Sequence, residues 1–319
     1  MTWLIVQFVI GVLVLTKAAD WFARGAGQLA ELSGLPRLLL AALLVGFVTN
    51  LPEFAISSMA AWMDRPGIAL GNPIGSIIVN TGLVLGILLA GASQIKIDPA
   101  WMRYHSLPML LACLALYVVA LWSDVTRPMA LLLLLLCGGY VYWSIACARR
   151  DPASLGVEGL ELDGRHNWAT VTALLAISIP LVVISSRWVL ATSVSIAYEL
   201  QVTETVIALT LVALGTSLPE LATALAAARR GHHDTSVGLI LGSNIYNALG
   251  VIGLGGLIAT LPVSLANRLF DLPVMLLVVM VALLPFALGR MPGRRTGLAL
   301  LAIYGVYTYS LFTLYGIFT

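Results

Sequence analysis

Apolar stretches long enough to cross a bilayer recur along the whole of this chain. A helix needs about 20 mostly apolar residues to span a membrane, and 60% of the 319 residues are hydrophobic while only 10% are charged. A soluble domain has about 25% charged residues. The sequence therefore predicts an all-α polytopic membrane protein. The ten predicted transmembrane helices are 2–22, 36–62, 67–91, 102–122, 127–148, 168–196, 202–228, 235–260, 269–289 and 296–317.

The basic residues are distributed unevenly between the two sides that these spans define. Lys and Arg gather in the cytoplasmic connections of membrane proteins. Of the 17 basic residues, 13 fall on the side that holds the polar segment 149–167, and four fall on the other side. We therefore expect a cytoplasmic linker loop at 149–167 and both termini outside. The net charge of +2 gives no indication of nucleic-acid binding.

One short motif occurs twice inside apolar sequence. Leu51-Pro52-Glu53 recurs as Leu218-Pro219-Glu220, at an offset of 167 residues. Five predicted spans separate the two copies, so the second copy enters the membrane from the opposite side, as in many secondary transporters. The sequence thus predicts two inverted five-helix repeats, 1–148 and 168–319. The same offset relates Thr49 to Thr216, Gly75-Ser76 to Gly242-Ser243, and Asn80 to Asn247.

Each copy of the motif places a proline before a glutamate within a predicted span. Pro52 and Pro219 have no amide hydrogen, and the ring of each clashes with the carbonyl four residues earlier. We expect each helix to kink or unwind there and to free carbonyl oxygens. Irregular backbone at membrane depth is tolerated only where it is buried in protein or lines a wet cavity.

The polar residues around the two glutamates share helix faces with them. Side chains three or four residues apart lie on one face of a helix. In the first repeat this groups Thr49 and Asn50 with Glu53, and Ser76 with Asn80. The equivalent residues of the second repeat are Thr216, Ser217, Glu220, Ser243 and Asn247. Carboxylate, hydroxyl and amide oxygens suit hard cations such as Ca²⁺ and Na⁺, and two ionised glutamates balance one divalent charge.

Other interpretations of the glutamates differ in what else they require. A single glutamate in a span is equally well explained as a neutral packing residue, but two beside equivalent prolines favour a binding site. An intramembrane enzyme with an acid/base pair also needs a nucleophile or a metal, and no His, Cys or Asp is near either glutamate in the sequence. A channel would use the glutamates as a selectivity ring. We therefore expect no enzymatic activity and no cofactor.

The two motif regions resemble the cation/calcium exchanger superfamily, whose members have two inverted alpha-repeats. "GTSLPE" at 215–220 and "GLILGSNIYN" at 238–247 resemble the second alpha-repeat, and "VTNLPE" at 48–53 and "GNPIGSIIVN" at 71–80 resemble the first. The two alpha motifs extend over 46–86 and 213–253. The chain resembles a prokaryotic sodium/calcium exchanger-like member of this superfamily, and the resemblance covers essentially the full chain. It implies a multi-pass protein of a bacterial or archaeal inner (plasma) membrane.

The resemblance also implies a function and a set of ligands. The function is secondary active antiport of Ca²⁺ against Na⁺ by alternating access, in which helices one and six slide over a core of helices two, three, seven and eight. The expected partners are the transported ions and the lipid bilayer, with no nucleic acid and no obligatory protein partner. The implied ligands are the carboxylates of Glu53 and Glu220, the side chains of Thr49, Asn50, Ser76, Asn80, Thr216, Ser217, Ser243 and Asn247, and the backbone carbonyls of Gly46 and Ala213.

Three positions depart from the pattern of this superfamily. Val48 stands where members usually have glycine, and Asn247 stands where several prokaryotic members have aspartate. Asn50 stands where sodium-coupled members have serine, and it is closer to the proton-coupled branch. The alternative function is therefore a proton-coupled exchanger of Ca²⁺ or of a broader range of divalent cations, with H⁺ in place of Na⁺.

Overall fold

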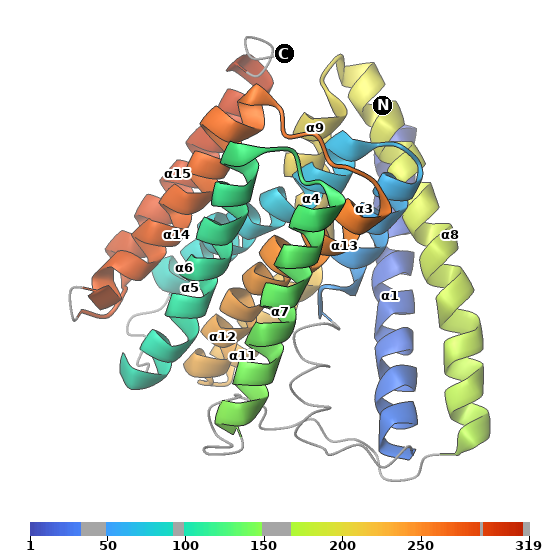
Figure 1. Cartoon of the computed structure of the whole chain (residues 1–319), viewed down its shortest axis with the longest axis horizontal. Helices are drawn as coiled ribbons and strands as arrows, with labels where there is room; N and C mark the ends of the chain where they lie inside the picture. Colours follow the sequence, from blue (N-terminus) through green and yellow to red (C-terminus); the bar gives the residue numbers. More distant parts are fainter. Residues whose placement is uncertain (33–48, 92–98, 149–166, 288–289, 315–319) are drawn as a thin grey trace.

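The computed structural model describes residues 1–32, 49–91, 99–148, 167–287 and 290–314, and every regular element in these ranges is a helix (Figure 1). Seven of the described helices are long and apolar enough to cross a membrane. An eighth crossing results if the bent pair Glu204–Thr216 and Leu218–Arg229 is one span. The predicted class, an all-α polytopic membrane protein, is confirmed.

Two of the ten predicted spans are not among these eight. For the span predicted at 36–62, residues 33–48 lie outside the described part of the chain, and α3 (Leu51–Trp62) is its described portion. The fourth span corresponds to α6 (Pro99–Trp122), whose described apolar stretch, Ser106–Trp122, is shorter than the others. The count of ten spans therefore stays a prediction.

The other elements follow the predicted order closely. Those of the first half are α1 (Thr2–Leu32), α4 (Pro66–Ile78), η1 (Val79–Leu85), α5 (Gly86–Gly91) and α7 (Arg127–Ala148). Those of the second half are α8 (Trp168–Leu200), α9 (Glu204–Ile207), η3 (Ala208–Val212), α10 (Ala213–Thr216), α11 (Leu218–Arg229), α12 (His233–Ile245), η4 (Tyr246–Val251), α13 (Ile252–Ile258), η5 (Asn267–Asp271), α14 (Leu272–Ala287) and α15 (Arg294–Leu314).

Helices α1 and α8 form an antiparallel pair along one edge of the molecule (Figure 1). A Cβ atom added at Gly11 would lie 2.9 Å from the side chain of Val189, and one at Gly25 would lie 2.9 Å from Leu175. From the first contact to the second, the residue number rises by 14 in α1 and falls by 14 in α8, so the two helices run in opposite directions. The start of α1 and the end of α15 lie at one end of the molecule, whereas α7 ends and α8 begins at the opposite end.

The first and sixth predicted spans were too short. We expected α1 to end near residue 22, but it continues to Leu32, and α8 ends at Leu200 rather than 196. Polar residues do not end α1, because they pair along its surface: Asp20 binds Lys17 and Arg24 at 3.2 Å each. These three residues are three and four positions apart, which is the spacing of neighbours on a helix surface.

The helix breaks predicted at the two prolines have closely similar backbone geometry. Asn50 precedes α3 with φ −85° and ψ 4°, and Ser217 precedes α11 with φ −82° and ψ 2°. Each following helix has its proline among the first two residues, where a missing amide hydrogen breaks no helical hydrogen bond. The helix axis bends by 42° between α10 and α11. The two repeats therefore share the discontinuity that places Glu53 and Glu220 at helix starts.

A second shared irregularity follows in the next helix of each repeat. The π-helical turns η1 and η4 begin at Val79 and Tyr246, which the offset of 167 makes equivalent. A π turn widens a helix locally and is frequent at functional sites. The equivalent packing is also symmetric: Gly86 contacts α15 at Leu301, and Gly253 contacts α7 at Leu134.

Close packing between the repeats depends on small residues of α4. A Cβ atom added at Gly75 would lie 2.7 Å from the backbone of Leu209 and 2.7 Å from the Cβ atom of Ala213. Helix α4 therefore crosses η3 and α10 so closely that any side chain at position 75 would overlap the backbone of Leu209. Spacing of small residues by four is a common basis of such contacts. This crossing brings the polar face of α4 against the break in the second repeat.

Candidate cation site

Two buried carboxylates define the candidate site. Glu53 and Glu220 are the third residues of α3 and α11, and their exposed fractions are 0% and 1%. The two carboxylates are close enough for their charges to repel one another. A carboxylate in the first turn of a helix is favoured by the unpaired amides and the positive end of the helix dipole. The two helix breaks thus direct both glutamates into one buried region.

Helices α4–η1 and α12–η4 provide the neutral part of the site. The amide nitrogen of Asn80 donates to the hydroxyl of Ser243 at 3.2 Å, and this hydroxyl lies 3.5 Å from Oε1 of Glu220. The hydroxyls of Ser76 and Thr216 are 3.4 Å apart. All five side chains are buried, and the contacts of Asn80 and Ser76 join the first repeat to the second. The structure therefore assembles the predicted residues from both halves into one cluster.

Asn50 links the break of the first repeat to α12 and η4 of the second. Its amide oxygen accepts hydrogen bonds from the hydroxyl of Ser243 at 2.9 Å and from the amide nitrogen of Asn247 at 3.0 Å. Its own amide nitrogen donates to the hydroxyl of Thr49 at 3.4 Å. Asn50 is fully buried, and Thr49 is half-buried. Among the predicted ligands, Thr49 is thus brought into contact with the cluster through Asn50.

Several oxygen atoms in this cluster are buried and have no hydrogen-bond partner among the described residues. They are Oε1 and Oε2 of Glu53, Oε2 of Glu220, the amide oxygens of Asn80 and Asn247, and the hydroxyl of Ser217. Burying a polar atom without a partner costs about 1–3 kcal/mol, and a charged atom costs more. Six such atoms in one region are therefore expected to bind a cation, which accepts their lone pairs.

The two predicted backbone ligands have different outcomes. Gly46 lies outside the described residues. Ala213 begins α10 and is buried, and its carbonyl accepts hydrogen bonds from the amide of Ser217 at 3.0 Å and the hydroxyl of Thr216 at 3.2 Å. Sodium coordination by either carbonyl therefore stays a prediction.

Four buried polar residues near the site were absent from the predicted set. Asn72 donates to the hydroxyl of Ser57 at 3.0 Å and accepts from the hydroxyl of Thr216 at 3.3 Å. Asn244 donates to the hydroxyl of Thr81 at 2.8 Å. A signal for Asn72 was present in the sequence, because it precedes Ser76 by four residues and so shares its helix face. Asn244 had a similar signal, because it precedes the predicted ligand Asn247 by three residues.

The ligand chemistry of the site differs from that of a transition-metal centre. Within the described ranges, no three His, Cys, Asp or Glu side chains lie together so that they could hold a metal ion. The donors that do meet are two carboxylates and neutral amide and hydroxyl oxygens. Oxygen donors of this kind select Ca²⁺, Na⁺ and similar hard cations rather than zinc or copper.

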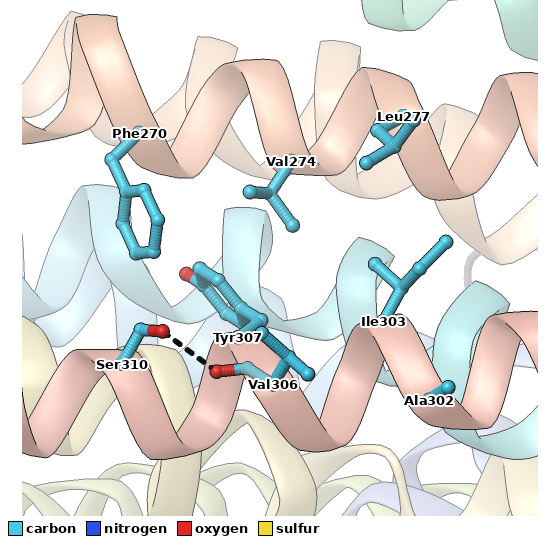
Figure 2. A pocket seen from close by; sticks show the side chains of 8 residues that line it. All are labelled: Phe270, Val274, Leu277, Ala302, Ile303, Val306, Tyr307 and Ser310. Carbon is cyan, nitrogen blue, oxygen red and sulfur yellow. Dashed lines mark hydrogen bonds between the residues drawn. The ribbon is translucent and has the colours of Figure 1, made fainter.

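A separate cavity of about 300 Å³ lies between α14 and α15 (Figure 2). Its lining is mostly apolar and includes Phe270, Val274 and Ile303. Tyr307 is one of two hydroxyl-bearing residues in this lining, and its hydroxyl donates to Asp271 at 2.9 Å. This cavity offers no converging oxygen atoms and involves neither glutamate, so it is not the candidate site.

The fold and the site together define a class of protein: a polytopic cation transporter built from two inverted copies of one helical unit. The chain belongs to the sodium/calcium exchanger protein family, whose sequence profile matches residues 3–146 and again residues 170–313. The two matches are displaced by 167 residues (170 − 3 = 167), which is the offset of the repeated Leu-Pro-Glu motif.

Individual relatives match over nearly the whole chain. An uncharacterized membrane protein of Methanocaldococcus jannaschii is 33% identical over 304 residues, which are 93% of this chain and 94% of that protein. The sodium/calcium exchanger MaX1 of Methanosarcina acetivorans is 28% identical over 95% of this chain and 97% of its own length. Among solved structures, the sodium-calcium exchanger NCX_Mj soaked with Na⁺ and Sr²⁺ has a TM-score of 0.64 and 29% identity, over 98% of this chain and 99% of that one.

Proposed function

We propose that this protein is a secondary active antiporter that exchanges Ca²⁺ for Na⁺ across the membrane by alternating access. The observation that supports this most directly is the group of six buried oxygen atoms without partners among the described residues, which includes three of the four carboxylate oxygens of Glu53 and Glu220. Ca²⁺ binds about six to eight oxygens in a flexible arrangement. Membership of the sodium/calcium exchanger family supports the same assignment.

Charge balance provides the coupling in this proposal. One Ca²⁺ neutralises the two carboxylates, and Na⁺ ions that compete for the same oxygens do so in its place. Without a bound cation, both glutamates would cross the bilayer as buried charges, each at a cost of at least ~2.5 kcal/mol. The loaded site therefore crosses and the empty site does not. In this cycle the transported ions are the only small molecules required.

The moving part in this proposal is the pair formed by α1 and α8. These helices pack against each other along their lengths, α1 touches α3 and α10 only briefly, and α8 also packs against α3. Hydrogen bonds between the repeats join the site elements: η1 is joined to α12 by that from Asn80 to Ser243, and α4 to α10 by the contact of Ser76 with Thr216. A rigid core with a sliding helix pair at its edge would expose the site first to one side and then to the other.

The proposed orientation places both termini outside and the connection between the repeats in the cytoplasm. It rests on the uneven distribution of Lys and Arg, 13 against four. The start of α1 and the end of α15 lie at one end of the molecule, and α7 ends and α8 begins at the other (Figure 1). The proposed location is the plasma membrane of a bacterium or archaeon.

The test is uptake of ⁴⁵Ca²⁺ into proteoliposomes that contain the purified chain. An outward sodium gradient is expected to drive uptake at equal pH, and uptake is expected to saturate and to require the internal Na⁺. Uptake driven by a pH gradient without sodium would identify the proton-coupled exchanger instead. Flux that does not depend on any counter-ion would indicate a channel and would overturn the proposal. Glu220→Gln is the negative control, because it removes one of the two carboxylates of the site.

A further inference from the structure

We infer that Asn50 does not bind the cation itself but fixes the polarity of the Asn247 side chain, so that the amide oxygen of Asn247 faces the cation. This inference rests on the proposed function, because it concerns the same site. It changes the role of Asn50 from a ligand to a positioning residue. The argument depends on which atoms of the two amides meet.

The amide oxygen of Asn50 already has two donors. The hydroxyl of Ser243 lies 2.9 Å from it and the amide nitrogen of Asn247 lies 3.0 Å from it. An amide oxygen has two lone pairs, and the two donors use both of them. Asn50 is also fully buried at the start of α3, so its side chain is enclosed by the groups it binds. A cation would have to displace one of these donors to reach it.

The contact with Asn50 decides which end of the Asn247 amide points into the site. The nitrogen of Asn247 is held by Asn50, and its oxygen is buried and has no partner among the described residues. The two ends of an asparagine amide have nearly the same shape but opposite hydrogen-bonding character. If the amide were reversed, its N–H groups would face the cation and repel it. The acceptor at Asn50 therefore selects the orientation in which Asn247 is a ligand.

The equivalent residues of the other half lack this arrangement. The offset of 167 relates Asn50 to Ser217 and Asn247 to Asn80. The nitrogen of Asn80 donates to Ser243 at 3.2 Å, and the hydroxyl of Ser217 has no partner in the described part of the chain. The contact between Asn50 and Asn247 joins the two halves, and the symmetry-related pair, Ser217 and Asn80, does not repeat it. It is not a general consequence of the repeated fold.

A double-mutant cycle separates a positioning residue from a ligand. A carboxylate has two equivalent oxygens, so Asn247→Asp presents oxygen to the cation whichever way the group turns. Asn50→Ala in the otherwise unchanged chain is expected to weaken ⁴⁵Ca²⁺ binding to the purified full-length protein by about tenfold. In the Asn247→Asp background, the same change is expected to weaken binding by less than about threefold, because no amide polarity remains to be set.

The matched control is Asn72→Ala. Asn72 is also a buried asparagine that binds the opposite repeat, but its contacts are with Ser57 and Thr216 rather than with Asn247. Its substitution is expected to have the same effect on binding in both backgrounds. Thermal unfolding without cation verifies that each variant is folded. If Asn50→Ala does not fold, Asn50→Ser repeats the cycle with a polar side chain that is too short to bind Asn247.

The outcomes distinguish this inference from the proposed function. An equal loss of binding from Asn50→Ala in both backgrounds would show a direct ligand and would overturn the inference alone. Failure of the unchanged chain to bind Ca²⁺ would overturn the proposed function, and the inference with it. If Asn50→Ala weakens Ca²⁺ binding strongly in the unchanged chain and only slightly in the Asn247→Asp background, the result supports both the inference and the proposed function.

Discussion

The hydroxyl of Thr216, in the second repeat, donates a hydrogen bond of 3.3 Å to the amide oxygen of Asn72, in the first. Asn72 is held in turn by the hydroxyl of Ser57, 3.0 Å from its amide nitrogen. All three residues are buried. The break in one repeat is thus held in place by a side chain of the other.

The first prediction concerns this contact. Asn72→Leu removes the partner of Thr216 and leaves the hydroxyl of Ser57 without the amide that binds it. We expect it to lower the free energy of unfolding by about 1–3 kcal/mol, because buried polar groups lose their partners. Thermal unfolding in detergent measures the effect. Thr216→Val is expected to cost less stability in the Asn72→Leu background than in the unchanged chain, because its partner is already lost; equal losses in the two backgrounds would contradict the assigned contact.

The second prediction concerns the two glutamates. Glu53→Gln combined with Glu220→Gln is expected to abolish Ca²⁺ exchange, because the site loses both charges that balance the cation. The same double variant is expected to unfold at a higher temperature than the unchanged chain when no cation is present, since two repelling buried carboxylates have been removed. Thermal unfolding with and without Ca²⁺ checks this. A variant that still gains stability from Ca²⁺ would exclude these carboxylates as the main ligands.

The third prediction concerns the crossing of α4 with η3. Gly75→Val is expected to destabilise the protein by about 1–3 kcal/mol, because the added atoms overlap the backbone of Leu209. Gly138, an exposed glycine in α7 with no atom within 4 Å of an added Cβ, provides the control. Gly138→Val is expected to leave the stability nearly unchanged. Similar effects at both positions would argue against the close crossing.

The fourth prediction tests the sliding pair. An added Cβ atom at Gly215 would lie 3.2 Å from the side chain of Val12 in α1, so cysteines at these two positions can form a disulfide between the pair and the core. In a chain whose three native cysteines are replaced, oxidation of Val12→Cys/Gly215→Cys is expected to stop exchange and reduction to restore it.

The control for the cross-link joins α1 to α8 instead. The chain offers Gly11→Cys with Val189→Cys, because these positions also meet within the pair. A disulfide there is expected to leave ⁴⁵Ca²⁺ exchange largely intact, since both helices would move together. If the two cross-links inhibit equally, α1 and α8 do not move as one unit.

The sequence predicted the repeated features well because the two copies constrain each other. The offset of 167 identified both helix breaks, and the breaks at Asn50 and Ser217 have nearly the same backbone angles. The pairing of Lys17 with Asp20, three residues apart, follows from the same kind of local spacing. Such features depend on residues within a few positions of one another. Local spacing is therefore sufficient to find them.

The contacts between the repeats could not be predicted in the same way. Helical spacing places Asn50 on the face of Glu53, but it does not reveal that Ser243 and Asn247 lie opposite. The positions of Asn244 and Thr81 depend likewise on how α12 packs against η1. The length of α1 was underestimated because hydropathy stops at charged residues, whereas this helix continues where Lys17, Asp20 and Arg24 pair on its surface.

The two halves are equivalent in backbone but not in the asparagines that join them, since Asn50 corresponds to Ser217 and Asn72 to Leu239. Opening toward one face of the membrane and opening toward the other therefore need not have equal activation barriers. Unequal barriers cannot change the direction of net flow, which the ion gradients alone determine. They do allow mutation to adjust the speed of each half of the cycle separately, a freedom that two identical halves would not have.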